Sequence, residues 1–335
     1  MQAVLRLYCF YYICCMRKIV LLSFALLSYT VNAQKNHNYT IGFYNVENLF
    51  DTLDDPEKND AEFLPEGKNQ WTEERYAKKL ADLNKVINEM GNLLVLGMAE
   101  IENERVIRDL LKVSNYSGTH GVVHFESPDD RGIDVGLIYD SLKLKLADAG
   151  KIRFIMPGMD RPTTRDILWA KFSYKKDTVY CMVNHWPSRR GGQETSEPNR
   201  MEAAKQARKF IDSVLLRQPA AKIIFMGDLN DYPQDNAPQF IAEKLRPQIN
   251  KSSGEYGGSY KYKGEWDVLD HIMISDGLLN ASKKITYVKD SGKILSPEFV
   301  MTEVKGQKYP HRTYGREYEG GYSDHLPVRI EVTLK

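Results

Sequence analysis

One short segment, residues 221–231, limits what this chain can fold into more than any other. The run "AKIIFMGDLND" reads as a buried strand that ends abruptly at Gly227 and continues into Asp228, Leu229 and Asn230. Residues i and i+2 of an extended chain point to the same side, so we expect Asp228 and Asn230 to project together from the strand end. A carboxylate beside a carboxamide could hold a phosphate, a water or a metal ion. The alternative is a simple turn, because polar residues favour turns.

Short strands and amphipathic helices alternate along the rest of the chain. Apolar residues three or four apart predict a helix over 72–91, capped by Thr72 and ended by Gly91, and a second over 196–219, capped by Ser196. No Gly/Ser linker or internal repeat divides the sequence, so we expect a single α/β domain. Besides 221–228, strands are expected at 39–50, 93–100, 132–140, 168–186 (a hairpin), 266–275 and 323–334.

The first residues have the pattern of an export signal. In "MRKIVLLSFALLSYTVNAQ", residues 16–34, two basic residues precede a short apolar stretch, and a small-x-small site ends at Ala33. We therefore expect 16–33 to be a signal peptide, 1–15 an over-extended start, and 34–335 the mature domain. This predicts an exported protein, periplasmic or extracellular, with no integral membrane span after cleavage. The alternative is an uncleaved anchor, although the apolar stretch is short for a membrane span.

Charge and cysteine content exclude two classes of protein. The chain has a net charge of +1, and residues 1–33 carry Arg6, Arg17 and Lys18 but no acid, so the mature charge is −2. A protein that binds nucleic acid through overall charge would be strongly basic, so any polyanion must bind to a local patch. Only Cys181 remains in the mature chain, which excludes an internal disulfide or a cysteine-rich metal site. Cys181 lies in an apolar run and is expected in the core.

Polar residues that suit phosphate chemistry mark the ends of other expected strands as well. Each one alone could be turn chemistry, or in the case of a histidine a buried core residue. Together with Asp228 and Asn230 they are hard to explain in that way. They are Asn45 in "FYNVENLF", Glu100 in "GMAEIEN", His185 in "MVNHWPS", Asp270 in "VLDHIMI", and Asp324 with His325 in "YSDHLPV".

This ordered set resembles the endonuclease/exonuclease/phosphatase superfamily, which includes deoxyribonucleases, bacterial sphingomyelinases and inositol-polyphosphate 5-phosphatases. The resemblance covers about residues 39–334, and its most specific parts are Gly-Asp-x-Asn at 227–230 and Ser-Asp-His at 323–325. It implies a deoxyribonuclease-like fold, a four-layered α-β-β-α sandwich of two packed mixed sheets. It also implies a metal-dependent hydrolase of phosphate esters.

The chemistry of that reaction needs a cation on the phosphoryl oxygens, an oriented water and an acid for the leaving oxygen. Hard oxygen ligands suit Mg²⁺, with Mn²⁺ or Ca²⁺ as possible substitutes. We expect Glu100 to be the first ligand, with Asn45 beside it. Asp324 is expected to hold a metal or to steady its neighbour.

The remaining residues are assigned to substrate and proton transfer. Asp228 would orient or deprotonate the attacking water, and Asn230 would donate its amide to a phosphate oxygen. His325, paired with Asp270, would act as base or as electrostatic stabiliser, two roles that the sequence leaves open. His185 is assigned as the general acid.

Arginines near these motifs are expected to bind the phosphate groups of the substrate. Arg161, Arg165 and Arg189 are the candidates, the alternative being ordinary solvated loop charges. The leading hypothesis is a monomeric, exported nuclease. The alternatives are a phospholipid or inositol-phosphate hydrolase of the sphingomyelinase type, and a catalytically silent binding module on the same scaffold.

Overall fold

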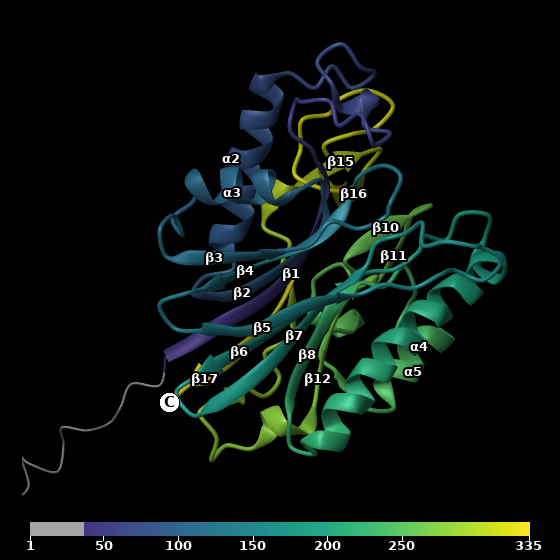
Figure 1. Cartoon of the computed structure of the whole chain (residues 1–335). Helices are drawn as coiled ribbons and strands as arrows, with labels where there is room; N and C mark the ends of the chain where they lie inside the picture. Colours follow the sequence, from purple (N-terminus) through teal and green to yellow (C-terminus); the bar gives the residue numbers. More distant parts are fainter. Residues whose placement is uncertain (1–36) are drawn as a thin grey trace, which may run out of the picture. The chain divides into compact units, whose positions relative to one another are not determined.

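Two mixed β-sheets form the centre of the structure (Figure 1). The computed structural model describes residues 37–335, of which Asn38–Leu334 form one compact unit. The larger sheet has the strand order β13-β17-β1-β2-β4-β3, with β14 paired to β17. Its strands are β1 (His37–Leu49), β2 (Leu93–Ile101), β3 (His120–His124), β4 (Asp134–Asp140), β13 (Ile285–Tyr287), β14 (Lys293–Ile294) and β17 (Val328–Leu334).

The second sheet has six strands in the order β5-β6-β7-β8-β12-β9. Each large sheet contains a parallel pair, β1 with β2 in the larger sheet and β7 with β8 in the second. The strands of the second sheet are β5 (Lys145–Ile152), β6 (Ile167–Tyr174), β7 (Asp177–His185), β8 (Lys222–Asp228), β9 (Arg246–Pro247) and β12 (Asp270–Ile274). Two separate hairpins are formed by β10 (Tyr260–Tyr262) with β11 (Glu265–Asp267), and by β15 (Met301–Val304) with β16 (Gln307–Pro310).

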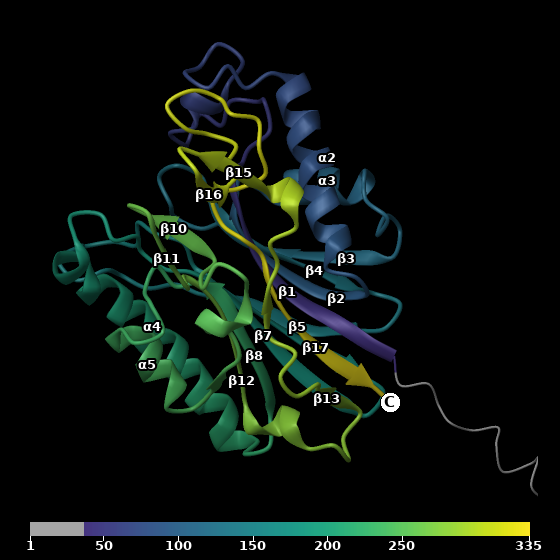
Figure 2. The ribbon, with the colours of Figure 1, turned by 180° about the vertical axis from the view of Figure 1, so that it is seen from behind.

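Helices cover the outer faces of the two sheets, which completes the predicted four-layered α-β-β-α sandwich. Helices α2 (Glu73–Glu89) and α3 (Glu104–Lys112) lie against the larger sheet, and α4 (Gln193–Arg217) and α5 (Asn236–Ala242) against the second (Figure 2). None of the helices within residues 37–335 is both long and apolar enough to span a bilayer. Short 3₁₀ turns occupy Ala61–Phe63, Lys251–Ser253, Asp276–Leu279 and Glu298–Val300.

The alternation of side chains along β8 separates two hydrophobic cores. Ile224 and Met226 belong to the core between the sheets, whereas Ile223 and Phe225 pack with α4 and α5. This follows from the two-residue period of a strand that is buried on both faces.

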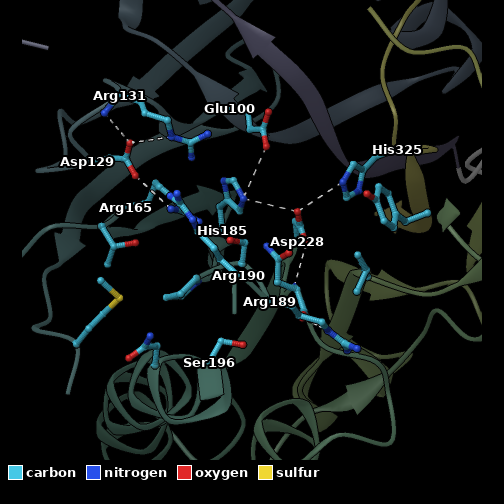
Figure 3. A pocket seen from close by; sticks show the side chains of 18 of the residues that line it. Glu100, Asp129, Arg131, Arg165, His185, Arg189, Arg190, Ser196, Asp228 and His325 are labelled. Atoms are coloured by element: carbon cyan, nitrogen blue, oxygen red, sulfur yellow. Dashed lines mark hydrogen bonds and ion pairs between the residues drawn. The ribbon is translucent and has the colours of Figure 1, made fainter. Parts of the chain in front are cut away.

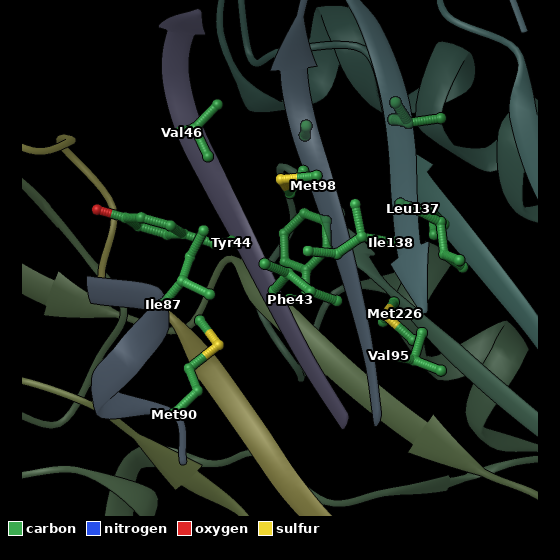
Figure 4. Close-up of a cluster of buried hydrophobic side chains, with 14 of the residues drawn as sticks. Phe43, Tyr44, Val46, Ile87, Met90, Val95, Met98, Leu137, Ile138 and Met226 are labelled. Atoms are coloured by element: carbon green, nitrogen blue, oxygen red, sulfur yellow. The ribbon is translucent and has the colours of Figure 1, made fainter. Parts of the chain in front are cut away.

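The two sheets approach each other closely at Gly97 of β2. A Cβ added there would lie 2.7 Å from Met226 Sδ and 3.0 Å from a Val183 methyl, so only a residue without a side chain fits. Figure 4 shows Met226 of the second sheet beside Val95 and Leu137 of the first. The inner faces of β2, β7 and β8 are therefore in direct contact.

The expected helix at 72–91 is confirmed, because the Thr72 side chain caps α2 and Gly91 follows it with a φ of 81°. The expected start of the second long helix is wrong. Helix α4 begins at Gln193 after Gly192, and Ser196 lies inside it, donating its hydroxyl to the Gly192 carbonyl at 2.6 Å. The expected strand 266–275 is two strands, β11 and β12. Cys181 is buried in the core as predicted, whereas residues 1–15 and 16–33 lie outside the described part.

Candidate active site

Three neighbouring strands of the second sheet place polar residues in one row. Asp228, the last residue of β8, is opposite His185 on β7 and opposite Asp270 on β12. All three continue the inner-face alternation to which Met226 belongs, so their side chains enter the space between the sheets. The apolar core therefore ends in a row of titratable groups at one edge of the sandwich.

The larger sheet contributes Asn45 from β1 and Glu100 from β2. The Asn45 amide donates to Glu100 Oε1 at 3.2 Å and to Asp228 Oδ2 at 3.1 Å, which links the two sheets across the site. Glu100 has a φ of 63° at a break in the β2–β4 register. By simple alternation it would share the outer face with Met98. The left-handed backbone instead turns the carboxylate toward Asn45, where the Asn48 amide also donates to it at 2.9 Å.

Asp228 and Asn230 do come together as predicted, but through a turn. Asn230 has a φ of 50°, and its backbone amide donates to Asp228 Oδ1 at 2.9 Å. The Asn230 carboxamide donates to the Trp186 carbonyl at 3.1 Å, and a second amide hydrogen remains for another acceptor. Burial, and to a smaller extent the Asp270 carboxylate, raises the pKa of Asp228 to about 7, although His325 acts in the opposite direction.

His325 forms the expected pair with Asp270. Its Nδ1 lies 2.8 Å from Asp270 Oδ2, and its Nε2 lies 3.8 Å from Asp228 Oδ2. Tyr260, which the sequence did not indicate, covers the imidazole with the ring centres 4.7 Å apart. Burial by itself would lower the pKa of His325, but the Asp270 and Asp228 carboxylates outweigh it and raise that pKa well above its usual range. We infer a charged imidazole at neutral pH.

His185 lies on the opposite side of Asp228 and has the opposite tendency (Figure 3). Its Nε2 is 3.7 Å from Asp228 Oδ2 and 3.9 Å from Glu100 Oε1, and its Nδ1 has no hydrogen-bond partner in the described residues. Burial, together with the positive charges of Arg165 and Arg131, lowers the pKa of His185 well below its usual range. The pKa values of the two histidines of the site are thus shifted in opposite directions.

A cavity of about 920 Å³ opens above this row. Two of the three predicted arginines line it. Arg165 is buried and donates to Asp129 Oδ2 at 3.2 Å and to the Trp186 carbonyl at 2.8 Å. Arg189 lies 2.6 Å from Asp235 and stacks on the Tyr232 ring at 3.7 Å.

The third predicted arginine, Arg161, is exposed and is not among the lining residues. Two other arginines, Arg131 and Arg190, do line the cavity, as do Tyr260 and Tyr262. Arg131 follows the unremarkable acidic pair at 129–130, so no local sequence signal pointed to it.

Asp324 lines the cavity but already has a partner. Its Oδ2 accepts from Arg312 at 3.2 Å, and Arg312 also bonds Glu47 at 3.1 Å. No hydrogen bond or ion pair joins Asp324 to Asn45 or Glu100 in the described part of the chain. Its assignment as a metal ligand stays a prediction. Burial and the Asp324 charge raise the pKa of Glu47, another residue missed from the sequence, to about 8.

The donor set fits a divalent metal ion. The carboxylates of Asp228 and Asp270 are buried, and Asp270 Oδ1 has no hydrogen-bond partner in the described residues. Glu100 is partly exposed and shares the Asn45 amide with Asp228. Ligand atoms of Asp228, Asp270 and His325 lie within 4.8 Å of one another. Hard oxygens of this kind suit Mg²⁺, which uses few carboxylates and keeps several waters. Glu100 would hold such an ion at the edge of the row. Asn45 presents its amide nitrogen to Glu100, and its Oδ1 accepts from the Glu47 amide at 3.0 Å, so its role as a ligand stays a prediction.

Residues 40–334 match the sequence model of the endonuclease/exonuclease/phosphatase family. Among solved structures, Bacteroides thetaiotaomicron mannosyl-6-phosphatase is 13% identical with a TM-score of 0.53, covering 88% of this chain and 99% of that one. The human Nocturnin catalytic domain with bound sulfate is 14% identical, with a TM-score of 0.56 and coverages of 89% and 95%. The D. rerio protein TDP2 with a single-stranded DNA product is 16% identical, with a TM-score of 0.56 and coverages of 89% and 99%. No curated protein sequence matches the chain.

The pairing of His325 with Asp270 has a measurable consequence. Asp270→Asn removes the charge that contributes most to keeping His325 protonated, so in chelator-treated protein the pKa of His325 should fall toward or below about 6.5. Imidazole NMR titration would measure the pKa, with His120 on β3 as an internal control. Unchanged titration of His325 in the variant would contradict the pairing.

Proposed function

Because this chain belongs to the endonuclease/exonuclease/phosphatase family, whose members are metal-dependent hydrolases of phosphate esters, we propose that it is an exported, Mg²⁺-dependent nuclease. One observation carries the choice of substrate. The cavity above the row of His185, Asp228 and Asp270, called the catalytic row below, has a volume of about 920 Å³, and its lining includes four arginines and three tyrosines, namely Arg131, Arg165, Arg189, Arg190, Tyr232, Tyr260 and Tyr262. Guanidinium groups bind phosphates, and aromatic rings stack on unpaired bases.

The residues of the row have distinct proposed roles. A pKa of about 7 lets Asp228 accept a proton from the attacking water near neutral pH. Charged His325, held by Asp270, would stabilise the negative charge that develops on the phosphoryl oxygens. The free amide hydrogen of Asn230 would bind one of those oxygens. A bound Mg²⁺ would supply Lewis-acid stabilisation of the same charge.

The lowered pKa of His185 leads us to revise its predicted role. A general acid must carry a proton, but burial and the positive charges of Arg165 and Arg131 lower the pKa of His185 well below its usual range, which favours the neutral ring at neutral pH. A neutral ring donates one hydrogen bond. We therefore propose that His185 binds a phosphoryl oxygen and that it does not protonate the leaving group.

Hydrolysis of phospholipids, inositol phosphates or phosphomonoesters remains the alternative, because the same catalytic row would serve those esters. The side chains that line the cavity determine which of these phosphate esters can bind. A panel of plasmid DNA, RNA, sphingomyelin and inositol phosphates, each with Mg²⁺, tests the proposal directly. Hydrolysis of a lipid or an inositol phosphate without hydrolysis of either nucleic acid would reject the nuclease.

Metal dependence is the second measurable part of the proposal. Glu100→Gln keeps the shape of the side chain but removes its charge, so the Mg²⁺ concentration needed for half-maximal activity should rise at least about tenfold. Glu104→Gln, four residues away in α3, is the matched control and should behave as wild type. Full activity in excess chelator would exclude the mechanism.

Changing the leaving group distinguishes a phosphate-binding His185 from a His185 that acts as the general acid. A phosphate-binding His185 predicts that His185→Ala loses about 10²–10³-fold in kcat/KM on a nucleotide diester and on bis-nitrophenyl phosphate alike. Nitrophenolate leaves without protonation, so a loss confined to the nucleotide diester would restore the general-acid role. His325→Ala should be impaired on both esters, since stabilisation of the phosphoryl charge is needed whichever group leaves.

Export is proposed from the sequence of residues 16–33 alone. N-terminal sequencing of the protein recovered from its native cells should begin at Gln34. A mature chain that retains Met16 would contradict cleavage and favour an anchor.

A further inference from the structure

The pair of His325 and Asp270 is held by a short segment to which the mechanism above gives no role. Ser259 is fully buried, and its Oγ accepts hydrogen bonds from the backbone amides of Leu269 at 3.2 Å and of Asp270 at 3.1 Å. The carbonyl of Ser259 accepts from the Leu326 amide at 2.7 Å. One residue therefore bonds the backbone of both partners, at Asp270 itself and directly after His325.

Tyr260, the next residue, covers the imidazole of the pair. It is the first residue of β10 and forms an isolated backbone bridge with His325. The two ring centres lie 4.7 Å apart, and the ring planes make an angle of 34°. Aromatic rings attract each other at this separation when they are offset or tilted. The imidazole thus meets Asp270 at one edge and the Tyr260 ring on one face.

The hydrogen bond to Asp270 cannot orient the imidazole by itself. It joins His325 Nδ1 to Asp270 Oδ2 at 2.8 Å, and the ring could still tilt about this single contact. A second flat ring against its face removes that freedom. His325 Nε2 is then left on the side of Asp228, 3.8 Å from Oδ2, which is where the attacking water and the phosphoryl group are proposed to meet.

We propose that Tyr260 is a positioning residue for the hydrolysis of the phosphate ester, because its ring holds the His325 imidazole with Nε2 directed at the phosphoryl group. This rests on the proposed function only as far as phosphate-ester hydrolysis, and not on the choice of a nucleic acid. The role belongs to the ring and not to the hydroxyl, since the ring makes the contact. Tyr262 also lines the cavity but is 55% exposed, so it is the more accessible of the two tyrosines for stacking on a base.

The kinetic test compares Tyr260→Leu with Tyr260→Phe. A misplacement of about 1 Å can cost about 10²-fold in rate, so Tyr260→Leu should lower kcat by roughly 10–10²-fold with little change in KM. The loss should appear on a nucleotide diester and on bis-nitrophenyl phosphate alike. Tyr260→Phe keeps the ring and should retain nearly full kcat.

Tyr309→Leu is the matched control for the packing of β10. The ring of Tyr309 lies 4.0 Å from Nζ of Lys261 on that strand, and Tyr309 is not among the residues that line the cavity. This variant should behave as wild type in both assays. A general disturbance of the strand is thereby separated from loss of the contact with His325.

Proton NMR of the free, chelator-treated protein supplies a readout that does not depend on hydrolysis. A tyrosine ring shifts the resonances of protons that lie against its face. The imidazole protons of His325 should therefore move in Tyr260→Leu and stay near their wild-type positions in Tyr260→Phe, at a pH where the imidazole is charged in every variant. If Tyr260→Leu does not fold, Tyr260→Met takes its place, because methionine also lacks a ring.

Three results would overturn the proposal. Unchanged kcat in Tyr260→Leu, with or without a rise in KM, would leave Tyr260 at most a substrate-binding residue. Equal impairment of Tyr260→Phe and Tyr260→Leu would assign the role to the hydroxyl. Unchanged His325 resonances in Tyr260→Leu would show that the ring does not hold the imidazole. If the nuclease proposal fails and another phosphate ester is hydrolysed, the same comparison is made on that ester, so the two failures are distinguishable.

Discussion

The two-residue period of the strands determines what reaches the space between the sheets, and both the core and the catalytic row depend on it. Along β7, β8 and β12 the inner face carries Val183, Met226 and Ile272, and the next inner position toward the site carries His185, Asp228 and Asp270. A register slip of one residue would turn these groups toward α4 and α5 and would bring the outer core into the inter-sheet space. A one-residue slip of β2 would bring Leu96 or Met98 to the place of Gly97, where Met226 and Val183 leave no room for a side chain. The geometry of the site is therefore fixed by the hydrophobic core beneath it.

The catalytic row brings together charges that would repel one another without specific partners. Asp228 and Asp270 are buried next to each other, where like charges cost most because little water screens them, and Glu100 lies at the partly exposed edge of the site. The Asn45 amide and the charged His325 compensate for part of this cost, and a raised pKa of Asp228 reduces it further. A site that keeps unfavourable negative charge in the free protein gains most when a cation binds. The repulsion between carboxylates that destabilises the free site thus favours metal binding.

The sequence predicted which residues form the site better than it predicted how they are placed. Asn45, Glu100, His185, Asp228, Asp270 and His325 could be recognised because each is a polar residue within or beside an expected apolar strand, and so many of them in one chain are hard to explain by turns alone. Asn45 in fact lies inside β1, whereas Asp228 is the last residue of β8. The alternation of side chains along β2 alone, however, would put Glu100 on the outer face of the sheet. Its left-handed backbone conformation turns the carboxylate toward the site instead. Arg131 and Tyr260 reach the cavity through tertiary contacts between segments far apart in the chain. Arg161 and Arg165 look equivalent in the sequence, but only Arg165 has a buried partner, Asp129, to hold it at the cavity.

The arginines of the cavity are largely neutralised within the protein, which limits what they can contribute to binding. Arg165 and Arg131 share the Asp129 carboxylate, and Arg189 is paired with Asp235. A phosphate chain entering the cavity would share these guanidinium groups with carboxylates already in place, so the electrostatic attraction is smaller than the number of arginines suggests. With a net charge of only +1 over the whole chain, there is little long-range attraction to replace it. Productive binding must therefore rest on the catalytic row and its metal, where the geometry selects a phosphate ester and not merely a negative charge.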